Sequence, residues 1–421
     1  MSELTEITSK NIEESSVKKT GIKVIMALQH LIAMFGSTVL VPILTGLDIS
    51  VALFCAGLGT LIFHLCTKRK VPVFLGSSFA FIPVIIAVGE VYGDLRYAQG
   101  GIFVAGLIYV IMSFLIKKIG TDRLHSFLPA QVVGPMIMVI GLNLIPTALD
   151  MAMTNIIIAV ITLGTTLLIK NFGKGFISQI AILCGVAVGY VVSLMTGLVD
   201  TAAISSAQMV AVPNFTLPKF SIGAIMMIAP VVLATFMEHI GDITTNGQVV
   251  GKDFIKDPGL NRTLLGDGLA TISASLLGGP ANTTYGENTG VLAITKNYDP
   301  SILRLAAVFA IVLSFISKFG MTIRTIPSCV MGGISLMLFS MIALVGVKTI
   351  KREKVKMNWK NIIVMAVILI IGFGGKILED YFGIFIGIKI TDTVTMSGLS
   401  FAAIVGVILN LILNGFGKNN K

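Results

Sequence analysis

The sequence predicts an all-α membrane protein with about fourteen transmembrane spans, arranged as two inverted repeats of seven spans. Three observations predict this fold. The chain of 421 residues is 55% hydrophobic and only 12% charged, whereas soluble domains carry roughly 25% charged residues. Apolar stretches long enough to cross a bilayer recur along the whole chain. Finally, two polar, glycine-containing stretches lie at corresponding places in its two halves.

The apolar stretches define fourteen candidate spans. They lie near residues 22–45, 50–66, 71–88, 98–117, 124–146, 152–169, 176–197, 222–243, 259–277, 282–297, 302–319, 327–347, 359–377 and 396–414. The third and tenth are short or interrupted by polar residues, so they are expected to be broken, with short extended segments. Residues 1–21 are polar and lack the apolar region of a signal peptide, which predicts a disordered cytoplasmic tail. Residues 416–421 are expected to form a second cytoplasmic tail.

The basic residues predict the orientation of these spans. With both termini inside, 25 of the 31 Lys and Arg fall on cytoplasmic segments, as the positive-inside rule requires. Removing either weak span would invert the later loops and destroy this asymmetry. The six outer basic residues are Arg96, Lys219, Lys318, Arg324, Lys376 and Lys389. Because the basic residues are dispersed, nucleic-acid binding is not expected.

The cysteines indicate no metal site and no cofactor. They are scattered, without the spacing of metal ligands or of a redox pair, and buried inert thiols are the expected interpretation. The four are Cys55, Cys66, Cys184 and Cys329.

The two weak spans resemble each other. The stretch GSSFA at 76–80 matches NTTYG at 282–286, so that Phe79 aligns with Tyr285. Gln29-His30 in the first span similarly matches Glu238-His239 in the eighth. Both pairs are related by a shift of seven spans, and an odd number of spans inverts the second copy. Paired broken segments in inverted halves indicate the midplane binding site of a transporter; chance similarity of short motifs is the alternative.

Three carboxylates within the predicted spans are singled out as candidate site residues: Glu238, Asp242 and Glu287. An acidic residue at that depth costs at least ~2.5–3.5 kcal/mol on insertion scales, which marks a functional site. Glu238 and Asp242 share one helix face and resist ionising together, so one of them is expected to hold a proton, as proton-coupled transport requires. His239 points elsewhere, and either packs against a hydrogen-bonding neighbour or takes part in proton transfer.

The surroundings of Glu287 predict the chemistry of a ligand. No basic residue is expected in the membrane interior, so Glu287 is protonated, bonded to the backbone or facing a ligand. The N–H groups of Phe79 and Gly286, at the starts of two half-helices, can donate to carbonyl groups. The Phe79 and Tyr285 rings can enclose a flat molecule. The expected ligand therefore has N–H donors, C=O acceptors and a flat face, as an oxidised nucleobase has.

Several motifs resemble those of a known family. ENTGVLAITK at 287–296 meets the signature of the nucleobase–ascorbate transporters: an acid or amide, Asn-x-Gly, four residues, Thr and a basic residue. NTTYG at 282–286, GSSFAF at 76–81, Gln29-His30, EHIG at 238–241 and DPGL at 257–260 also match. The chain resembles this family, the nucleobase–cation symporters of the second type, over residues 22–414, and within it the uracil-transporting members of bacteria.

The resemblance implies two domains and a dimer. Spans 1–4 and 8–11 (residues 22–119 and 222–320) would form a core domain that binds the substrate. Spans 5–7 and 12–14 (residues 120–200 and 321–415) would form a gate domain, through which two copies would pair. Residues 201–221 would form an external loop. The protein would lie in the bacterial inner membrane.

The resemblance also implies a function and a set of site residues. It implies a proton-coupled uracil importer that works by alternating access and is not an enzyme. The implied substrate-binding residues are Glu238, Glu287, Phe79, Gly286, Tyr285 and Ser78; the proton-coupling residues are Asp242, Glu238 and His239; the supporting residues are Asn288, Gln29 and His30. An acid at 287 favours uracil, whereas Asp242 stands where uracil permeases usually have a histidine and is more similar to purine transporters.

Three other functions are compatible with parts of the pattern. A symporter of the same fold could carry a purine such as xanthine or urate. A passive channel could also use broken helices. A membrane enzyme is the weakest alternative, because the sequence has no metal-ligand cluster, nucleophile elbow or phosphate-binding loop.

Overall fold

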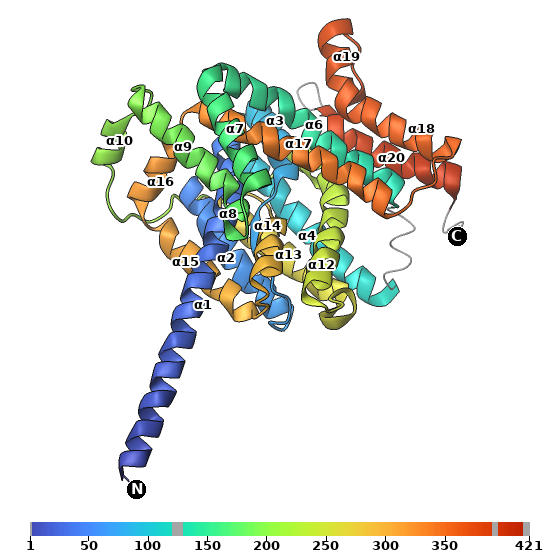
Figure 1. Cartoon of the computed structure of the whole chain (residues 1–421). Coiled ribbons are helices and arrows are strands. Elements are labelled where there is room, and N and C mark those ends of the chain that lie inside the picture. Colours follow the sequence, from blue (N-terminus) through green and yellow to red (C-terminus); the bar gives the residue numbers. More distant parts are fainter. Residues whose placement is uncertain (1, 120–128, 390–394, 416–421) are drawn as a thin grey trace.

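The computed structural model describes residues 2–119, 129–389 and 395–415, and for residues 2–19, 376 and 380 it describes the backbone alone. Most of this chain is helical (Figure 1). Each of the fourteen predicted segments contains helix. The start of the fifth segment, at 124, and the predicted tail at 416–421 lie outside the described residues.

The first half of the chain contains one short strand and a series of helices. They are α1 (Ser2–Thr45), α2 (Ile49–Cys66), β1 (Leu75–Ser77), the 3-10 turn η1 (Phe79–Phe81), α3 (Ile82–Tyr92), α4 (Arg96–Ile119), α6 (Ala130–Met153), α7 (Ile156–Phe172), α8 (Phe176–Gln179) and α9 (Ala181–Met195).

The second half repeats this pattern and adds a hairpin. Its elements are α10 (Thr201–Ser206), α11 (Ile222–Ile228), η2 (Ala229–Val231), α12 (Val232–Val250), η3 (Ile255–Gly259), α13 (Leu260–Leu277), β2 (Asn282–Thr284), α14 (Gly286–Thr295), α15 (Pro300–Ser314), α16 (Ser317–Arg324), α17 (Ser328–Arg352), α18 (Trp359–Leu369), η4 (Ile370–Gly374), α19 (Gly375–Phe382), β3 (Gly387–Lys389), β4 (Thr395–Ser397) and α20 (Gly398–Asn414).

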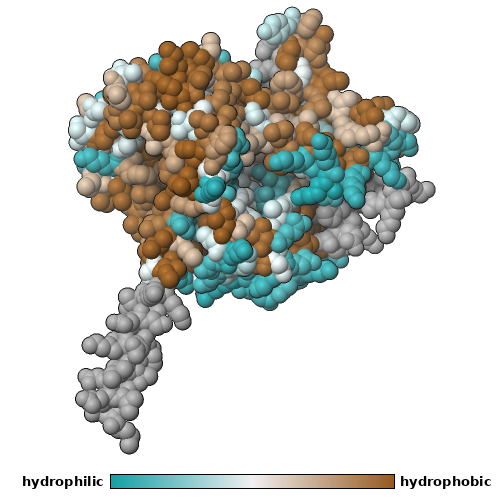
Figure 2. All heavy atoms as spheres, in the orientation of Figure 1, coloured by the Kyte–Doolittle hydropathy of each residue, from teal (hydrophilic) through white to brown (hydrophobic). Residues whose placement is uncertain are grey.

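Six helices in the described residues are long and apolar enough to cross a membrane, or seven if α15 and α16, bent by 82°, form one span. The six are Thr20–Thr45, Ile49–Cys66, Arg96–Lys118, Ala130–Met153, Ile222–Val250 and Ser328–Arg352. Figure 2 shows that apolar side chains cover most of the visible face, while hydrophilic ones gather along its lower edge and in a group to the right of its centre. This distribution is typical of a protein that spans a membrane.

Two features differ from the sequence prediction. Helix α1 begins at Ser2, so most of the segment expected to be a disordered tail continues the helix of the first span. No proline precedes Pro42 and one glycine, Gly21, precedes Gly36, so the sequence contains little that would end this helix. Strands β3 and β4 also pair with each other in a loop where no strand was expected. The run from Ile388 to Met396 is rich in β-branched residues, which favour strands.

The packing of the helices relates the two halves of the chain. Helix α13 packs against α4, and α2 packs against α15. In the order of the predicted spans these are spans 9 and 4, and spans 2 and 11. A shift of seven spans turns span 2 into span 9 and span 4 into span 11, so it converts one pair into the other. Helix α6 packs against α17, and this pair (5–12) maps onto itself. The described contacts therefore have the symmetry expected of two repeats.

Small residues allow the closest of these approaches. A Cβ atom added to Gly106 on α4 would lie 2.9 Å from the carbonyl oxygen of Gly268 on α13, and the reverse distance is also 2.9 Å. Any larger side chain at either position would push the two helices apart. Close packing through glycine is common between helices in membranes, where helix association gains little from the hydrophobic effect.

Candidate functional site

Strands β1 and β2 lie inside the two segments that the sequence predicted to be broken. They pair antiparallel, with Leu75 opposite Thr284 and Ser77 opposite Asn282. Helical structure begins directly after each strand, at Phe79 in η1 and at Gly286 in α14. Because helical structure begins at Phe79 in one half and at Gly286 in the other, these two residues are equivalent in the structure. The sequence alignment had paired Phe79 with Tyr285, one residue earlier.

The start of α14 opens onto free space. Gly286 is exposed although the residues before it are buried, and a Cβ atom there would meet nothing within 4 Å. Among the described residues, the N–H groups of Phe79 and Gly286 have no hydrogen-bond acceptor. Unpaired N–H groups at a helix start favour a negatively polarised ligand atom. These two amides can therefore bind carbonyl oxygens, as the sequence predicted.

Helix α1 fixes the residues that follow Gly286. The Ser37 hydroxyl donates a hydrogen bond of 2.6 Å to Oε1 of Glu287. The side-chain amide of Asn288 lies 3.1 Å from Nδ1 of His30 and donates to the His30 carbonyl at 3.0 Å. The predicted supporting residues Asn288 and His30 are thus in contact. Gln29, next to His30 in the chain, is partly buried.

Helix α12 brings two further carboxylates to the same region. Glu238 and Asp242 are partly buried, as Glu287 is. The hydroxyl of Thr284, the last residue of β2, donates to Oδ2 of Asp242 at 3.1 Å. Both carboxyl groups interact electrostatically with Glu287 on α14. The structure therefore gathers the three acidic residues that the sequence singled out.

His239 faces a different partner. Its Nδ1 lies 2.8 Å from Oδ2 of Asp267 on α13, and its Nε2 lies 2.9 Å from the Thr263 hydroxyl. His239 and Asp267 are almost fully buried, at 0% and 1% exposure. This geometry favours the packing interpretation of His239. A role of His239 in proton coupling stays a prediction.

The aromatic and hydroxyl residues occupy unequal positions. Tyr285 is buried, its hydroxyl donates to the Ser77 carbonyl at 3.0 Å, and its ring lies against Gly76. Phe79 is only partly buried and keeps some ring surface free. Ser78 is buried, and its hydroxyl has no partner among the described residues. The available stacking surface therefore comes mainly from Phe79.

Sequence reasoning missed three residues that build this site: Ser37, Thr284 and Asp267. Asp267 carried a usable signal, because it is an acidic residue inside a predicted span. Ser37 carried no signal, because a hydroxyl in an apolar helix usually bonds to its own backbone. Thr284 lies in the NTTYG motif, but the motif did not indicate that its hydroxyl meets Asp242. Their importance comes only from the carboxylates that the fold places beside them.

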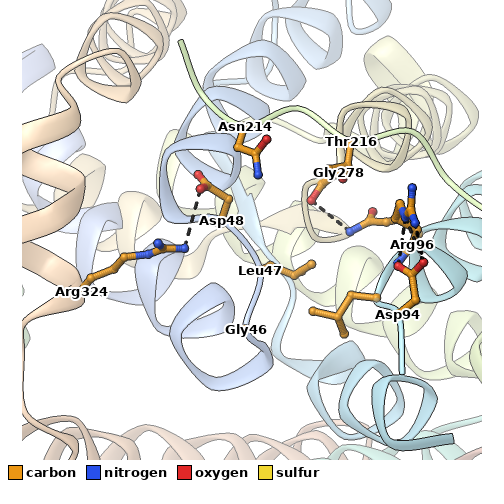
Figure 3. Close-up of a pocket in the computed structure, with 11 residues that line it drawn as sticks. Gly46, Leu47, Asp48, Asp94, Arg96, Asn214, Thr216, Gly278 and Arg324 are labelled. Carbon is orange, nitrogen blue, oxygen red and sulfur yellow. Dashed lines mark hydrogen bonds and ion pairs between the residues drawn. The ribbon is translucent and has the colours of Figure 1, made fainter. Parts of the chain in front are cut away.

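A second polar pocket, of about 250 Å³, lies among the ends of α1, α4, α13 and α16 (Figure 3). Arg324 points towards Asp48, and Arg96 folds onto Asp94. The side chain and backbone N–H of Arg96 donate to Asp94, and together with Lys219 they hold the pKa of that carboxyl well below its usual range. The basic residues of this pocket are among those predicted to be external.

Comparison with solved structures identifies the class of fold. The chain resembles the transmembrane domain of the cyanobacterial bicarbonate transporter BicA, with a TM-score of 0.61 over 94% of this chain and 97% of that one at 14% identity. It also resembles the murine anion transporter Slc26a9 in the inward-facing state, with a TM-score of 0.68 over 93% of this chain and 68% of that one at 10% identity. At such identities the likeness establishes the fold alone: that of a multi-pass membrane transporter.

Comparison of sequences identifies the family. A family model described as a permease family matches residues 21–380, and the chain belongs to this family, the nucleobase–ascorbate transporters. Its relatives include the uracil permease of Bacillus subtilis (strain 168), 44% identical over 92% of this chain and 91% of the relative. The uracil permease of Bacillus caldolyticus is 43% identical over 94% of this chain and 93% of the relative. That of Escherichia coli (strain K12) is 39% identical over 92% of this chain and 90% of the relative. The predicted family is confirmed, and the chain is a membrane permease, not an enzyme.

Proposed function

We propose that this chain is a proton-coupled uracil importer of a bacterial inner membrane, and that it works by alternating access around a midplane site. The observation that carries the proposal is the opening at the start of α14. There the exposed Gly286 lies next to Glu287, and Glu238 from α12 faces the same region. The relatives named uracil permease support uracil as the ligand.

The chemistry of the site matches that of uracil. Uracil has two N–H donors and two carbonyl acceptors on one flat ring. Glu238 and Glu287 supply carboxylate acceptors for the N–H groups, and the amides of Phe79 and Gly286 supply donors for the carbonyls. The free part of the Phe79 ring can lie against the face of the ligand. Ser78 and Tyr285 complete the proposed site, Ser78 through its unpaired hydroxyl and Tyr285 by holding the Ser77 backbone.

Ion pairs between loops support the arrangement of fourteen spans, because both partners of a pair must lie on one side of the membrane. The pairs are Lys70–Asp257 (2.6 Å), Lys23–Asp299 (3.4 Å), Asp94–Lys219 (3.1 Å) and Asp48–Arg324 (3.8 Å). The first two join segments predicted to be cytoplasmic, and the last two join segments predicted to be external. Two residues lie on the same side only if the chain between them crosses the membrane an even number of times. If the other twelve spans are kept, this holds for all four pairs only when segments 71–88 and 282–297 both cross.

Contacts between the proposed domains support alternating access. Helices α1, α12 and α14 of the proposed core each present a glycine to a side chain of the proposed gate. The contacts are Gly36 with Ile182, Gly241 with Arg352 and Gly290 with Gln179. Glycines offer no side chain to interlock, so one domain can move along the other at these points. The proposed homodimer through the gate domain and the cytoplasmic location of both termini rest on the resemblance and on the charge distribution.

We further propose that Glu238 and Asp242 share one transported proton. They lie one helical turn apart on α12, and their charges interact. Two such carboxylates inside a membrane resist ionising together. Asn at 242 would keep the hydrogen bond from Thr284 but could not hold a charge. Asp242→Asn is therefore expected to abolish the acceleration of uptake by external acid, and unchanged acid dependence would contradict the proposal.

A purine such as xanthine or urate is the second candidate ligand. The observation that favours it is Asp242, which stands where the resemblance implies a histidine in uracil permeases. Competition separates the two: an excess of unlabelled xanthine or urate should leave uracil uptake unchanged if uracil is the substrate. Inhibition by purine, with little inhibition by thymine, would favour the second candidate.

Uptake of radiolabelled uracil into proteoliposomes, with and without an imposed inward proton gradient, tests the proposal. Saturable uptake that depends on the gradient is the expected result. Uptake that does not saturate and persists without the gradient would indicate a passive channel. No uptake by correctly folded protein would refute the choice of uracil, and labelled purines would then be tested in the same vesicles.

A further inference from the structure

The two-stranded sheet leaves one edge of each strand without a partner strand. Ser78 N–H donates to the Ala281 carbonyl and Tyr285 N–H to the Phe74 carbonyl. Because inward and outward residues alternate in an antiparallel pair, Leu75 and Asn282 point their N–H and C=O groups away from the sheet. Inside a membrane, backbone groups without partners are costly. The outward groups of these two residues therefore need acceptors and donors from elsewhere.

A threonine from the preceding helix meets each of these residues. Thr60 on α2 accepts from the N–H of Leu75 at 2.8 Å. Its hydroxyl donates to the Ala56 carbonyl in its own helix at 2.8 Å and lies 3.4 Å from the Leu75 carbonyl. Thr271 on α13 accepts from the N–H of Asn282 at 3.3 Å and donates to the Asn282 carbonyl at 3.2 Å. Both threonines are buried, at 0% and 2% exposure.

The contacts with the strand N–H groups are equivalent in the two halves. Each threonine lies on the helix that directly precedes its strand, and each meets the first residue of that strand. The buried Thr45, by contrast, bonds to a carbonyl one turn earlier in its own helix and to no strand residue. What distinguishes Thr60 and Thr271 from Thr45 is that each accepts a hydrogen bond from the N–H of a strand residue.

We propose that Thr60 and Thr271 are positioning residues of the uracil site, each aiming one backbone donor at the ligand. Thr60 holds β1, which ends two residues before Phe79. Thr271 holds β2, which ends two residues before Gly286. The amides of Phe79 and Gly286 are the donors without partners, so a small shift of either strand changes their direction towards the ligand. This proposal rests on the proposed function.

The test replaces each hydroxyl with a methyl group of similar size. T60V leaves the N–H of Leu75 without its acceptor, and T271V leaves the N–H and the C=O of Asn282 without their partner. Each is expected to raise the KM for uracil about tenfold, within the range for losing a hydrogen bond that aligns a buried group, while Vmax changes less than about twofold. T60S and T271S keep the hydroxyl and should restore the KM. T45V is the matched control and should behave as the wild type.

The selectivity of uptake between uracil and its thio analogues distinguishes misdirected backbone amides from a general defect of the site. Sulfur accepts hydrogen bonds weakly, so 2-thiouracil and 4-thiouracil each lack one of the two carbonyl contacts. T60V should lose the preference for uracil over one thiouracil, and T271V should lose it over the other. Equal loss of affinity for uracil and both thiouracils, or an unchanged KM for uracil, would overturn the proposal.

Protein abundance and identity of the substrate are controlled separately. The amount of each variant in the membrane is measured, so that a folding defect is not taken for a change in KM. If T60V does not reach the membrane, T60C replaces it, because a thiol is a weak donor and acceptor; an intermediate rise in KM is then expected, and no rise would overturn the proposal. A wild type without saturable uracil uptake would refute the proposed function instead.

Discussion

Replacing Ser37 with alanine tests whether helix α1 orients the ligand-binding carboxylate of α14. The Ser37 hydroxyl donates to Oε1 of Glu287 at 2.6 Å, and Ser37 is completely buried. Glu287 has no other hydrogen-bond partner among the described residues. The S37A substitution removes this bond and nothing larger than one oxygen atom. Any effect on the ligand therefore passes through the position of the Glu287 carboxylate.

The expected size of the effect follows from the kind of bond. A hydrogen bond to a charged group contributes about 1.5–3 kcal/mol, which corresponds to about 10–150-fold in affinity. Glu287 is only partly buried, so water can replace part of the lost bond. We therefore expect the lower end: a rise of about tenfold in the KM for uracil. The maximal rate should change less, because Ser37 is not proposed to carry the proton.

The measurement is concentration-dependent uptake into proteoliposomes that contain equal amounts of reconstituted protein. Ser335 on α17 provides the matched control. It is also completely buried, but its hydroxyl has no hydrogen-bond partner among the described residues. S335A should leave the KM unchanged. If S37A also left the KM within about twofold of the wild-type value, the inference that Ser37 orients Glu287 would be wrong.

Two further substitutions test the packing of β1 and the outer pocket. A Cβ atom in G76A would lie 2.3 Å from the Tyr285 ring, so we expect a loss of about 1–3 kcal/mol in stability and a lower melting temperature in detergent. G164A is the control, because a Cβ atom there meets nothing within 4 Å. Equal melting temperatures of the two variants would contradict this prediction. The hydrogen bond from Arg96 lowers the pKa of the Asp94 carboxyl. The ionised carboxyl therefore stabilises the folded protein fully above the ordinary Asp pKa of about 3.9, and this stabilisation is lost only as the pH falls through the lowered pKa. D94N should therefore lower the melting temperature equally at pH 5 and pH 8. A decrease that is present at pH 8 and vanishes at pH 5 would contradict this, because the carboxyl would then titrate above its ordinary pKa.

The location of the candidate site could be predicted because its signals are local. Glu238, Asp242 and Glu287 stand out as acids in apolar segments, and glycine and polar residues mark the two interrupted stretches. The structure brings these residues together and begins a helix at Phe79 and at Gly286, as expected. The one-residue shift in the repeat alignment was not predictable, because short motifs fix the register less firmly than the paired strands do.

The sequence by itself determined that this is a membrane permease of a particular family, since composition, apolar length and motif spacing are properties of the chain alone. Only the tertiary structure decided which groups pair. Ser37 and Glu287 are 250 residues apart, and His239 meets Asp267 on another helix. The hydroxyls of Thr60 and Thr271 acquire their role only because two strands end beside them. The physical reason is that hydrogen-bond partners depend on how distant helices pack, and no local pattern records that arrangement.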